Sequence, residues 1–391
     1  MSMLKIRTYN TIATQGLERF SRENYEVASE VATPAAFVLR SQNLINEAFP
    51  DSLLAIARAG AGTNNVPLER CSENGIVVFN TPGANANAVK ELVLAGLLLS
   101  SRGIVEGMNY VSQMDSAMDE QTLAKEMEAQ KKRFKGGELA GKTLGIVGLG
   151  AIGSLVANMA ISLGMNVVGF DPAISIEAAW KLSSDVEKMD NLSSLLARTD
   201  FVSLHVPAIE ATRHMISKDS LANAKPGICI LNFAREQIVD IDAILSAMDQ
   251  GIVGRYVTDF PVPALLRHEK AILMPHIGAS TAEAEINCAV MAADQVIDFL
   301  ENGNIKNSVN FPLAKMQRTG GFRLTFTNEN VSGVLGHVLS VLAEESLNVV
   351  DMLNKSRENL AYNILDLEQQ PSEQVLVKIR AVEHVINVRS L

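Results

Sequence analysis

The middle of the chain alternates short runs of apolar, largely β-branched residues with longer stretches of helical periodicity. Six runs are apolar at nearly every position, as expected of strands buried on both faces of a sheet. They cover residues 142–150, 165–171, 200–206, 227–234, 255–260 and 271–277. Strands that alternate with helices favour a parallel, doubly wound α/β sheet of the Rossmann type. We predict that this nucleotide-binding domain covers residues 89–282.

A smaller series of strand-like runs precedes that sheet, at residues 4–10, 35–41, 53–60 and 75–83. The helical pattern of residues 86–104 would lead from this series into the sheet. A later helical pattern ends at Gly303, and its apolar positions suit a return to the first series. We therefore predict a discontinuous, flavodoxin-like substrate-binding domain that consists of residues 1–88 and 283–310.

The pattern changes once more near the C-terminus. Over residues 320–391 the order of expected elements is strand, helix, strand, strand, helix, strand. This βαββαβ order predicts a small ferredoxin-like domain. Residues 311–319 would connect it to the rest of the chain as a linker.

Three glycines with the spacing GxGxxG stand between an apolar strand and a helix; they are Gly148, Gly150 and Gly153. The first permits a tight turn, the second lets a pyrophosphate approach the backbone, and the third lets helix and strand pack closely. The helix would start near Ile152, and because its N-terminus attracts phosphate groups, Ala151 and Ile152 are further candidates for the cofactor site. Asp171 ends the next strand, where a carboxylate accepts hydrogen bonds from an adenosine ribose and repels a 2′-phosphate. This order predicts NAD binding rather than NADP binding; the alternative is that the glycines serve only a turn.

Further candidates for the cofactor site follow the later strands, because ligands of open parallel sheets lie at the carboxyl ends of the strands. The candidates for the adenine side are His205, Val206, Pro207 and Thr212. The candidates for the nicotinamide side are Asn232, Phe233 and Ala234. Each of these residues is also ordinary in a loop, so none predicts a site by itself.

Arg235 and His276 also follow strands of this sheet. A guanidinium just past a buried strand can bind a carboxylate with two hydrogen bonds and polarise a neighbouring carbonyl. An imidazole can give and take the proton of an alcohol during hydride transfer. An exposed surface arginine and a structural histidine are the alternatives, but both residues share the predicted crevice with the glycine loop.

Composition and charge exclude several classes of protein. The net charge of −10 argues against a general nucleic-acid surface. No apolar run approaches the roughly 18 residues that a membrane helix needs, and the N-terminus lacks an apolar signal core, so we expect a cytoplasmic protein. Three widely spaced cysteines, Cys71, Cys229 and Cys288, indicate neither disulfides nor a zinc site. We expect no bound metal.

Seven segments together resemble the D-2-hydroxyacid dehydrogenase family: FVLRSQN, IARAGAGTNNV, TPGANANAVKEL, ELAGKTLGIVGLGAIGSLVA, LHVPAIEATRHMI, LNFARE and MPHIGAST. They extend over nearly the whole chain and are specific in combination. Within the family, the chain is most similar to members that oxidise 3-phospho-D-glycerate to 3-phosphohydroxypyruvate in serine biosynthesis and end in an ACT domain. The resemblance implies an NAD-dependent enzyme that forms a homodimer or homotetramer.

The resemblance also implies roles for individual residues. Arg235 would bind the substrate carboxylate, Asp259 would lie near the nicotinamide carboxamide, and His276 would act as acid and base. Two further cofactor contacts would come from Gly278 and Ala279. Substrate contacts would come from Arg58, Ala59, Gly60, Ala61 and Asn85, as well as from Arg235 and His276.

A phosphorylated substrate needs additional cations, because the net charge of the chain is unfavourable. Arg40 is one candidate, and the run Lys131, Lys132, Arg133 is another. A basic run is usually a solvated face. We therefore place Arg40 ahead of the run.

The resemblance fails at one position. Most relatives have a glutamate five residues after the aspartate that corresponds to Asp259, and this glutamate hydrogen-bonds the catalytic histidine. Here that position holds Ala264, and Glu269 is the nearest acid that would reach His276 from another direction. Either Glu269 substitutes, or His276 works without a carboxylate.

The C-terminal segment resembles an ACT domain, a regulatory module that commonly binds amino acids between paired copies. In serine-sensitive relatives the first strand ends in a His-x-Asn pattern. Asn330 matches its asparagine and Asn348 matches a second one, whereas Asn328 replaces the histidine. Serine feedback is one implication, and an oligomerisation module without effector is the alternative.

Two other functions stay open at the level of sequence. A glyoxylate or hydroxypyruvate reductase of the same family is one, although such enzymes generally lack the C-terminal module. A binding protein that senses NAD without turnover is the other, and the missing glutamate favours it. The retention of Arg235 and His276 favours an enzyme.

Overall fold

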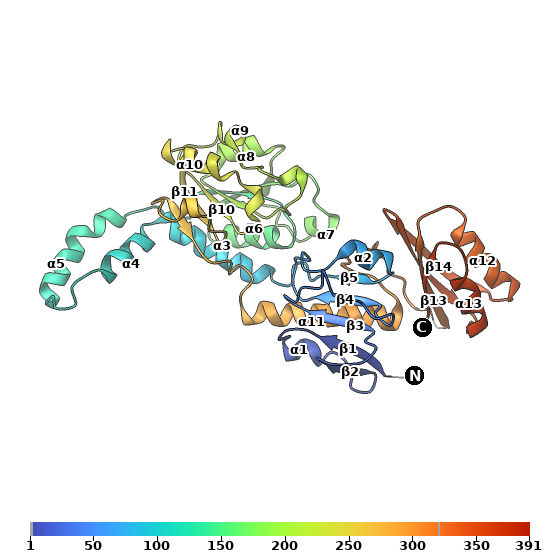
Figure 1. The fold of residues 1–391 in the computed structure, drawn as a ribbon. Coiled ribbons are helices and arrows are strands. Elements are labelled where there is room, and N and C mark those ends of the chain that lie inside the picture. The colour runs from blue at the N-terminus through green and yellow to red at the C-terminus, as the bar shows by residue number, and fades with distance from the viewer. Residues whose placement is uncertain (1–2, 320) are drawn as a thin grey trace. The chain divides into compact units, whose positions relative to one another are not determined.

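The chain forms two compact units. The structure is a computed structural model that describes residues 3–319 and 321–391, without the side chain of Glu177. The first unit consists of residues 1–85 and 282–391, and the second of residues 86–281 (Figure 1). The C-terminal residues belong to the first unit, so the predicted separation of a linker and a third domain stays a prediction.

A five-stranded parallel sheet forms the centre of the first unit. Its order is β2-β1-β3-β4-β5, which is the strand order of the flavodoxin-like fold and confirms the prediction. The strands are β1 Leu4–Thr8, β2 Tyr25–Ala28, β3 Ala36–Leu39, β4 Ala55–Arg58 and β5 Val77–Phe79; the helices are α1 Thr14–Leu17, α2 Leu68–Glu73 and α11 Ala282–Asn302.

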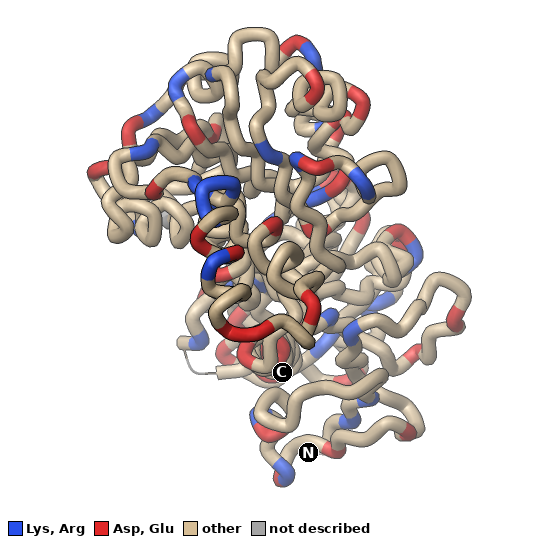
Figure 2. The backbone as a smooth tube through the Cα atoms, turned by 90° about the vertical axis from the view of Figure 1, so that its left-hand side faces the viewer, with Lys and Arg blue, Asp and Glu red and all other residues tan. Residues whose placement is uncertain are grey.

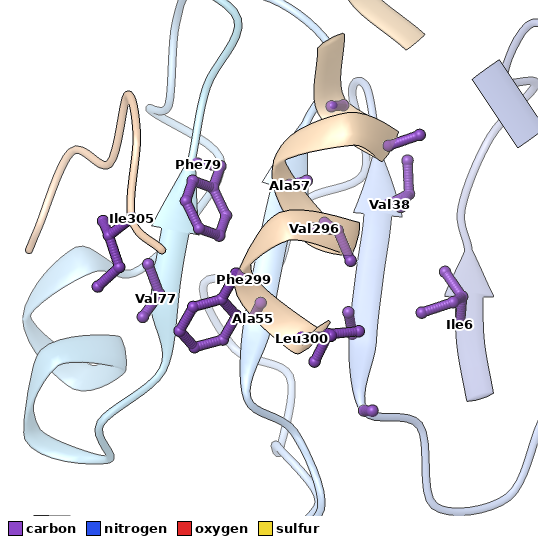
Figure 3. Packing of buried hydrophobic residues seen from close by; sticks show 14 of the residues in the cluster. Ile6, Val38, Ala55, Ala57, Val77, Phe79, Val296, Phe299, Leu300 and Ile305 are labelled. Atoms are coloured by element: carbon purple, nitrogen blue, oxygen red, sulfur yellow. The ribbon is translucent and has the colours of Figure 1, made fainter. Parts of the chain in front are cut away.

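Helix α11 covers one face of this sheet, although it comes more than 200 residues later in the chain. Val296, Phe299 and Leu300 point from the helix toward the buried side chains of β3, β4 and β5 (Figure 3). The Phe299 ring meets Phe79 of β5 edge to face, with ring centres 5.8 Å apart. This packing closes the discontinuous domain, as the apolar spacing of the helix predicted.

A seven-stranded parallel sheet forms the second unit, in the order β12-β11-β10-β9-β6-β7-β8. The first six strands in the chain have the doubly wound order of dinucleotide-binding folds, which confirms the Rossmann prediction. The strands are β6 Thr143–Val147, β7 Asn166–Phe170, β8 Val186–Lys188, β9 Phe201–Leu204, β10 Ile228–Asn232, β11 Val253–Thr258 and β12 Ala271–Leu273. Two separate apolar clusters are built on its strands, as expected of a sheet covered on both faces.

The helices of this unit connect successive strands. The longer ones are α3 Ala86–Ser101, α6 Ala151–Ser162, α8 Leu192–Arg198 and α10 Ile241–Asp249; short ones are α7 Ile176–Ala179, η2 Glu210–Thr212, α9 Lys218–Leu221, η3 Glu236–Ile238 and η4 Pro263–Leu265. Between α3 and β6 the chain forms α4 Ile104–Ser112 and α5 Glu120–Gln130, which extend away from the sheet (Figure 1), and then η1 Lys131–Phe134. These three elements have no buried residue.

The C-terminal residues form a four-stranded antiparallel sheet in the order β14-β15-β13-β16. Two helices pack on one face through an apolar cluster, which confirms the ferredoxin-like prediction. The elements are β13 Phe322–Glu329, α12 Val334–Glu344, β14 Val349–Arg357, β15 Leu360–Leu367, α13 Glu373–Arg380 and β16 Val385–Ser390.

The C-terminal end of α11 is capped by side chains from this domain and from the segment before it. The last carbonyls of a helix have no partner within the helix. Here the carbonyls of Phe299 and Leu300 accept from Arg389, that of Glu301 from Arg318, that of Asn302 from Arg323, and that of Gly303 from the Tyr362 hydroxyl. Three of the four donors are guanidinium groups, which also suit the negative end of the helix dipole.

A buried ion pair joins two strands next to this end of the helix. Arg323 of β13 donates to both carboxylate oxygens of Asp366 of β15, at 2.6 and 2.8 Å, and both side chains are at most 2% exposed. Burial would raise the pKa of Asp366, but the hydrogen bonds and charge of Arg323 lower it overall. Arg323 also donates to the carbonyls of Met316 and Gln317. With the bonds to Asp366 and to the Asn302 carbonyl, every N–H group of its guanidinium has an acceptor.

Candidate active site

The glycine loop has the geometry that a pyrophosphate requires. Gly148 directly follows β6 and has φ +90°, and a Cβ there would lie 2.7 Å from the His205 carbonyl oxygen. A Cβ on Gly153 would lie 1.9 Å from the Gly148 carbonyl oxygen, whereas one on Gly150 would meet no atom within 4 Å. Gly150 precedes the first residue of α6, Ala151. Its open surroundings therefore leave room for a phosphate at the N-terminus of this helix.

Asp171 is tied to that loop. Its Oδ2 accepts from the amide of Leu149 at 2.8 Å, and its Oδ1 accepts from the amide of Ala173 at 2.9 Å. The carboxylate therefore lies beside the glycine loop at the carboxyl end of β7. A carboxylate in this position can accept hydrogen bonds from the ribose of NAD.

The residues predicted for the adenine side are largely occupied by contacts with the protein. The Thr212 hydroxyl donates to the Pro207 carbonyl at 2.5 Å and accepts from the Ile209 amide, so it closes the loop after β9. The His205 Nε2 is 2.9 Å from the Ser203 hydroxyl oxygen, and burial lowers the His205 pKa to about 3. His205 is therefore neutral near pH 7, and Val206 is partly buried against one apolar cluster of this unit. Sequence did not indicate this structural use of His205 and Thr212.

The loop after β10 is held by Asn232, which is fully buried. Its Nδ2 donates to the Arg235 carbonyl at 2.9 Å, and its Oδ1 accepts from the Ala234 amide at 3.2 Å. Phe233 is buried, whereas the Arg235 side chain is exposed and donates to the Ala234 carbonyl at 2.6 Å. Asn232 thus fixes the backbone from which the guanidinium of Arg235 projects.

Asp259 follows β11, the neighbour of β10, and is 1% exposed. Its Oδ2 accepts from the Gly278 amide at 2.9 Å, which joins the loops after β11 and β12. Its Oδ1 is buried without a hydrogen-bond partner among the described residues. A buried carboxylate oxygen is normally satisfied, so this atom fits a donor such as the carboxamide of NAD. Gly278 and Ala279 lie beside it in the same loop.

His276 follows β12, the next strand of the sheet. Its exposed ring lies 4.9 Å from the ring of Phe260, at an angle of 52°. No carboxylate pairs with this imidazole in the described part of the chain. Arg235, Asp259 and His276 therefore follow three adjacent strands at one edge of the sheet. Phe260 is a neighbour that the sequence pattern did not single out.

The structure does not bring Glu269 to His276. Glu269 precedes β12 and His276 follows it, so the two residues flank opposite ends of this strand. The carbonyl of Glu269 accepts from Arg255, and its side chain is exposed. Ala264 lies in η4 and is also exposed. Of the two readings of the sequence, the geometry favours a histidine without a carboxylate partner.

The substrate candidates of the first unit gather at the carboxyl edge of its sheet. Arg40 follows β3, and Arg58 ends β4. The Arg58 Nε donates to the Arg40 carbonyl at 3.1 Å, and the Arg58 Nη1 lies 1.8 Å from where a Gly60 Cβ would be. Asn85 is half-buried in the turn before α3. Ala59 is buried and Ala61 is half-buried after β4, so Arg40, Arg58 and residues 59–61 lie at the carboxyl ends of the neighbouring strands β3 and β4.

The basic run occupies η1, where its residues contact their own surroundings. Lys131 pairs with Glu128, and the Arg133 guanidinium lies over the ring of Tyr110, 5.3 Å from its centre. Lys132 is exposed. Figure 2 shows acidic and basic residues mixed along the chain.

The described residues contain neither a metal-binding cluster nor a membrane-spanning helix. Among residues 3–319 and 321–391, no group of three or more His, Cys, Asp or Glu side chains would hold a metal ion. None of the described helices is long and apolar enough to cross a membrane. The three cysteines are buried and free, and burial raises the pKa of Cys71 and of Cys229 to about 12.

The predicted effector residues lie far apart in the C-terminal domain. Asn330 follows β13 and donates to the carbonyl of Glu358, in the turn between β14 and β15. Asn348 precedes β14, next to the opposite end of β15. Asn328 is 4% exposed, and its amide is bonded to Asn363 and to the Glu329 carbonyl. One copy of the domain therefore does not bring Asn330 and Asn348 together.

Similar proteins are known both as sequences and as structures. The chain is 33% identical to D-3-phosphoglycerate dehydrogenase of Haemophilus influenzae over 358 residues, which cover 88% of this chain and 82% of that protein. It is 32% identical to the Escherichia coli K12 protein of the same name over 366 residues, or 90% and 84% of the two chains. The NAD⁺-bound 3-phosphoglycerate dehydrogenase of Entamoeba histolytica has a TM-score of 0.61 and 26% identity, covering 79% of this chain and 99% of that one.

The family itself is identified by the nucleotide-binding unit and by these relatives together. Residues 104–278 match the family model described as "D-isomer specific 2-hydroxyacid dehydrogenase, NAD binding domain". This match contains the glycine loop, Asp171, Arg235, Asp259 and His276. The chain therefore belongs to the D-isomer specific 2-hydroxyacid dehydrogenase family and is an NAD-dependent dehydrogenase.

Proposed function

We propose that this enzyme oxidises 3-phospho-D-glycerate to 3-phosphohydroxypyruvate. The observation that carries the proposal is the set of three residues, Arg235, Asp259 and His276, that follow adjacent strands β10, β11 and β12. The names of the relatives from Haemophilus influenzae and Escherichia coli support this substrate. Arg40 and Arg58, at one edge of the other parallel sheet, provide cations for an anionic substrate.

The residues of the chain have separate roles in this proposal. Arg235 binds the substrate carboxylate with its planar guanidinium and polarises the oxygen on C2. His276 takes the proton of the C2 hydroxyl as the alcohol is oxidised, and returns it in the reverse direction. Asp259 orients the cofactor through its free Oδ1. NAD, when bound, supplies the acceptor for the hydride.

His276 works in this proposal without a glutamate partner. Its ring is positioned by the tilted ring of Phe260, whose centre lies 4.9 Å away, rather than by a carboxylate. Phe260 is held in turn, since its amide donates to the Thr258 hydroxyl at 3.1 Å. Thr258 donates to the Asn232 carbonyl at 2.8 Å. Thr258 and Asn232 are both buried, so their hydrogen bonds connect Phe260, which positions His276, with the loop that carries Arg235.

The substrate phosphate is assigned to Arg40 rather than to the basic run in η1. Lys131 and Arg133 are already engaged within their own segment. Arg40 projects from the carboxyl edge of a parallel sheet, where ligands of such sheets bind. Its side chain is 41% exposed, and its guanidinium pairs with the exposed Glu285 at 2.6 Å, a partner that an incoming anion can replace.

The reduction of NAD, followed by absorbance at 340 nm, tests the proposal. We expect turnover of 3-phospho-D-glycerate in the presence of a reagent that traps the keto product. Arg40→Ala should raise KM for 3-phospho-D-glycerate at least about ten-fold, which corresponds to a charge-assisted hydrogen bond, with a smaller effect on D-glycerate. The Lys132→Ala variant is the matched control. Equal losses for both substrates contradict the assignment of Arg40, and no turnover with 3-phospho-D-glycerate contradicts the substrate.

We further propose that serine regulates the enzyme at the C-terminal domain, and that the enzyme is a homodimer or homotetramer. Asn330 and Asn348 lie near opposite ends of the sheet, so a small amino acid that contacts both would bind between two copies. Serine should then inhibit turnover, and Asn348→Ala should weaken the inhibition. If serine has no effect on kcat or KM at millimolar concentration, the domain has another role.

A further inference from the structure

Arg40 and Glu285 form an ion pair although they are 245 residues apart in the chain. The Nη1 of Arg40, just after β3, lies 2.6 Å from the Oε1 of Glu285, in the first turn of α11. The side chains are 41% and 47% exposed. Ion pairs with this exposure contribute little to the stability of the fold. Stability alone therefore does not explain why a carboxylate faces Arg40.

The backbone of Arg40 is held firmly by other residues. The Oδ1 of Asn10 accepts from the amides of Ser41 and Gln42, at 3.0 and 2.8 Å. The Arg40 carbonyl accepts from Arg58 and from Asn65. Within residues 3–319 and 321–391, only Glu285 binds the guanidinium itself. The base of the side chain is therefore fixed, and its charged end has one partner that an anion can replace.

Two positive features lie beside this pair, whereas Glu283 in the same turn of α11 is negative. Arg58 lies beside Arg40 at the same edge of the sheet, and the N-terminal end of α11 adds the positive end of a helix dipole. A carboxylate at this place offsets that charge when no substrate is present. It also repels an anionic group that approaches Arg40.

We propose that Glu285 is a specificity-determining residue, because it is an internal counter-ion that the anionic group of the substrate must displace from Arg40. The inference rests on the proposed function, in which Arg40 binds the substrate phosphate. Glu285 acts through Arg40 and does not touch the reacting atoms. Its effect should therefore appear in KM for a phosphorylated substrate and leave kcat nearly unchanged.

The variants Glu285→Gln and Glu283→Gln of the full-length chain test this. Glu283 is exposed, lies in the same turn of α11 and makes no ion pair with a described residue, so it controls for a simple change of net charge. We expect Glu285→Gln to lower KM for 3-phospho-D-glycerate about three- to ten-fold, with kcat within about two-fold. KM for D-glycerate and the kinetics of Glu283→Gln should stay close to those of the wild type.

An unchanged or increased KM for 3-phospho-D-glycerate in Glu285→Gln would overturn the inference, since an increase means that Glu285 holds Arg40 in place for the substrate. The double variant Arg40→Ala, Glu285→Gln provides a second check. In this background the glutamine should no longer lower KM, and a persistent effect would show that Glu285 does not act through Arg40. If the wild-type enzyme fails to oxidise 3-phospho-D-glycerate, the proposed function is wrong instead.

Discussion

The carboxylate of Asp259 accepts a hydrogen bond from the Gly278 amide through Oδ2, at 2.9 Å, while its Oδ1 is buried and unpaired within the described chain. Asn in place of Asp259 would put an amide group at one of two acceptor positions. We expect Asp259→Asn to weaken NADH binding at least about ten-fold, measured by NADH fluorescence. Asp185→Asn removes an exposed carboxylate of the same unit and should bind NADH normally. Equal affinities of the two variants would contradict this role.

Asp171 lies beside the glycine loop, where it accepts from the amides of Leu149 and Ala173. A negative charge at this place disfavours the 2′-phosphate of NADP. Asp171→Asn should reduce the preference for NAD over NADP about ten-fold or more. The ratio of kcat/KM for the two cofactors measures this preference. A ratio equal to that of the wild type would mean that the discrimination comes from elsewhere.

Glu269 and His276 flank opposite ends of β12, so no proton can pass directly between them. The pH dependence of kcat/KM in Glu269→Gln should therefore coincide with that of the wild type. If the acid-side limb of the kcat/KM profile is shifted in Glu269→Gln, Glu269 does interact with the imidazole of His276. His276→Gln should lower kcat by about 100-fold or more, as expected for the loss of an acid and base.

Arg323 and Asp366 are buried together, so removing one partner leaves an unpaired buried charge. Arg323→Met should lower the free energy of unfolding by about 3–5 kcal/mol, measured by urea denaturation. Replacing both residues, as in Arg323→Met with Asp366→Leu, should recover part of this loss. The exposed pair Arg380 and Glu373 is the control, and Arg380→Met should change stability by less than about 1 kcal/mol.

The pKa of His205 is lowered by burial from 6.5 to about 3. Between these pH values the unfolded chain binds a proton that the folded chain does not. The contribution of neutral His205 to the free energy of unfolding is therefore fully present above about pH 6.5. Below that pH it falls by up to about 1.4 kcal/mol per pH unit. His205→Gln should lose stability less steeply than the wild type between about pH 6.5 and 4, in urea denaturation at several pH values. His337→Gln, on an exposed face of α12, should follow the wild type.

The three sheets of the fold follow from local patterns. Strands buried on both faces are apolar throughout, and long helices repeat their apolar positions, so both can be found without knowledge of their partners. The glycine loop is predictable for the same reason, since its conformation limits the residue types at three neighbouring positions. Two short edge strands, β2 and β8, were not predicted. They have three or four residues each and lie at the edges of their sheets, where partners rather than propensity determine pairing.

The site was predicted only as a list of strand ends. Sequence indicated Arg235 and His276, because both follow apolar runs, and the family resemblance added Asp259. It did not indicate that the Thr212 hydroxyl is used within its own loop, or that Phe260 lies against His276. Nor did it indicate the pair of Arg40 and Glu285, because contacts between residues 245 positions apart leave no local pattern.

The capping of α11 has a consequence for the evolution and engineering of this chain. The carbonyls that end this helix receive their hydrogen bonds from Arg318, Arg323, Tyr362 and Arg389, all of which follow residue 311. A chain cut at that point would leave these carbonyls without protein donors, at the end of a helix that fills the core of the flavodoxin-like sheet. The C-terminal domain is thus not a module that can be exchanged freely between dehydrogenases. Any replacement must bring its own donors to the same helix.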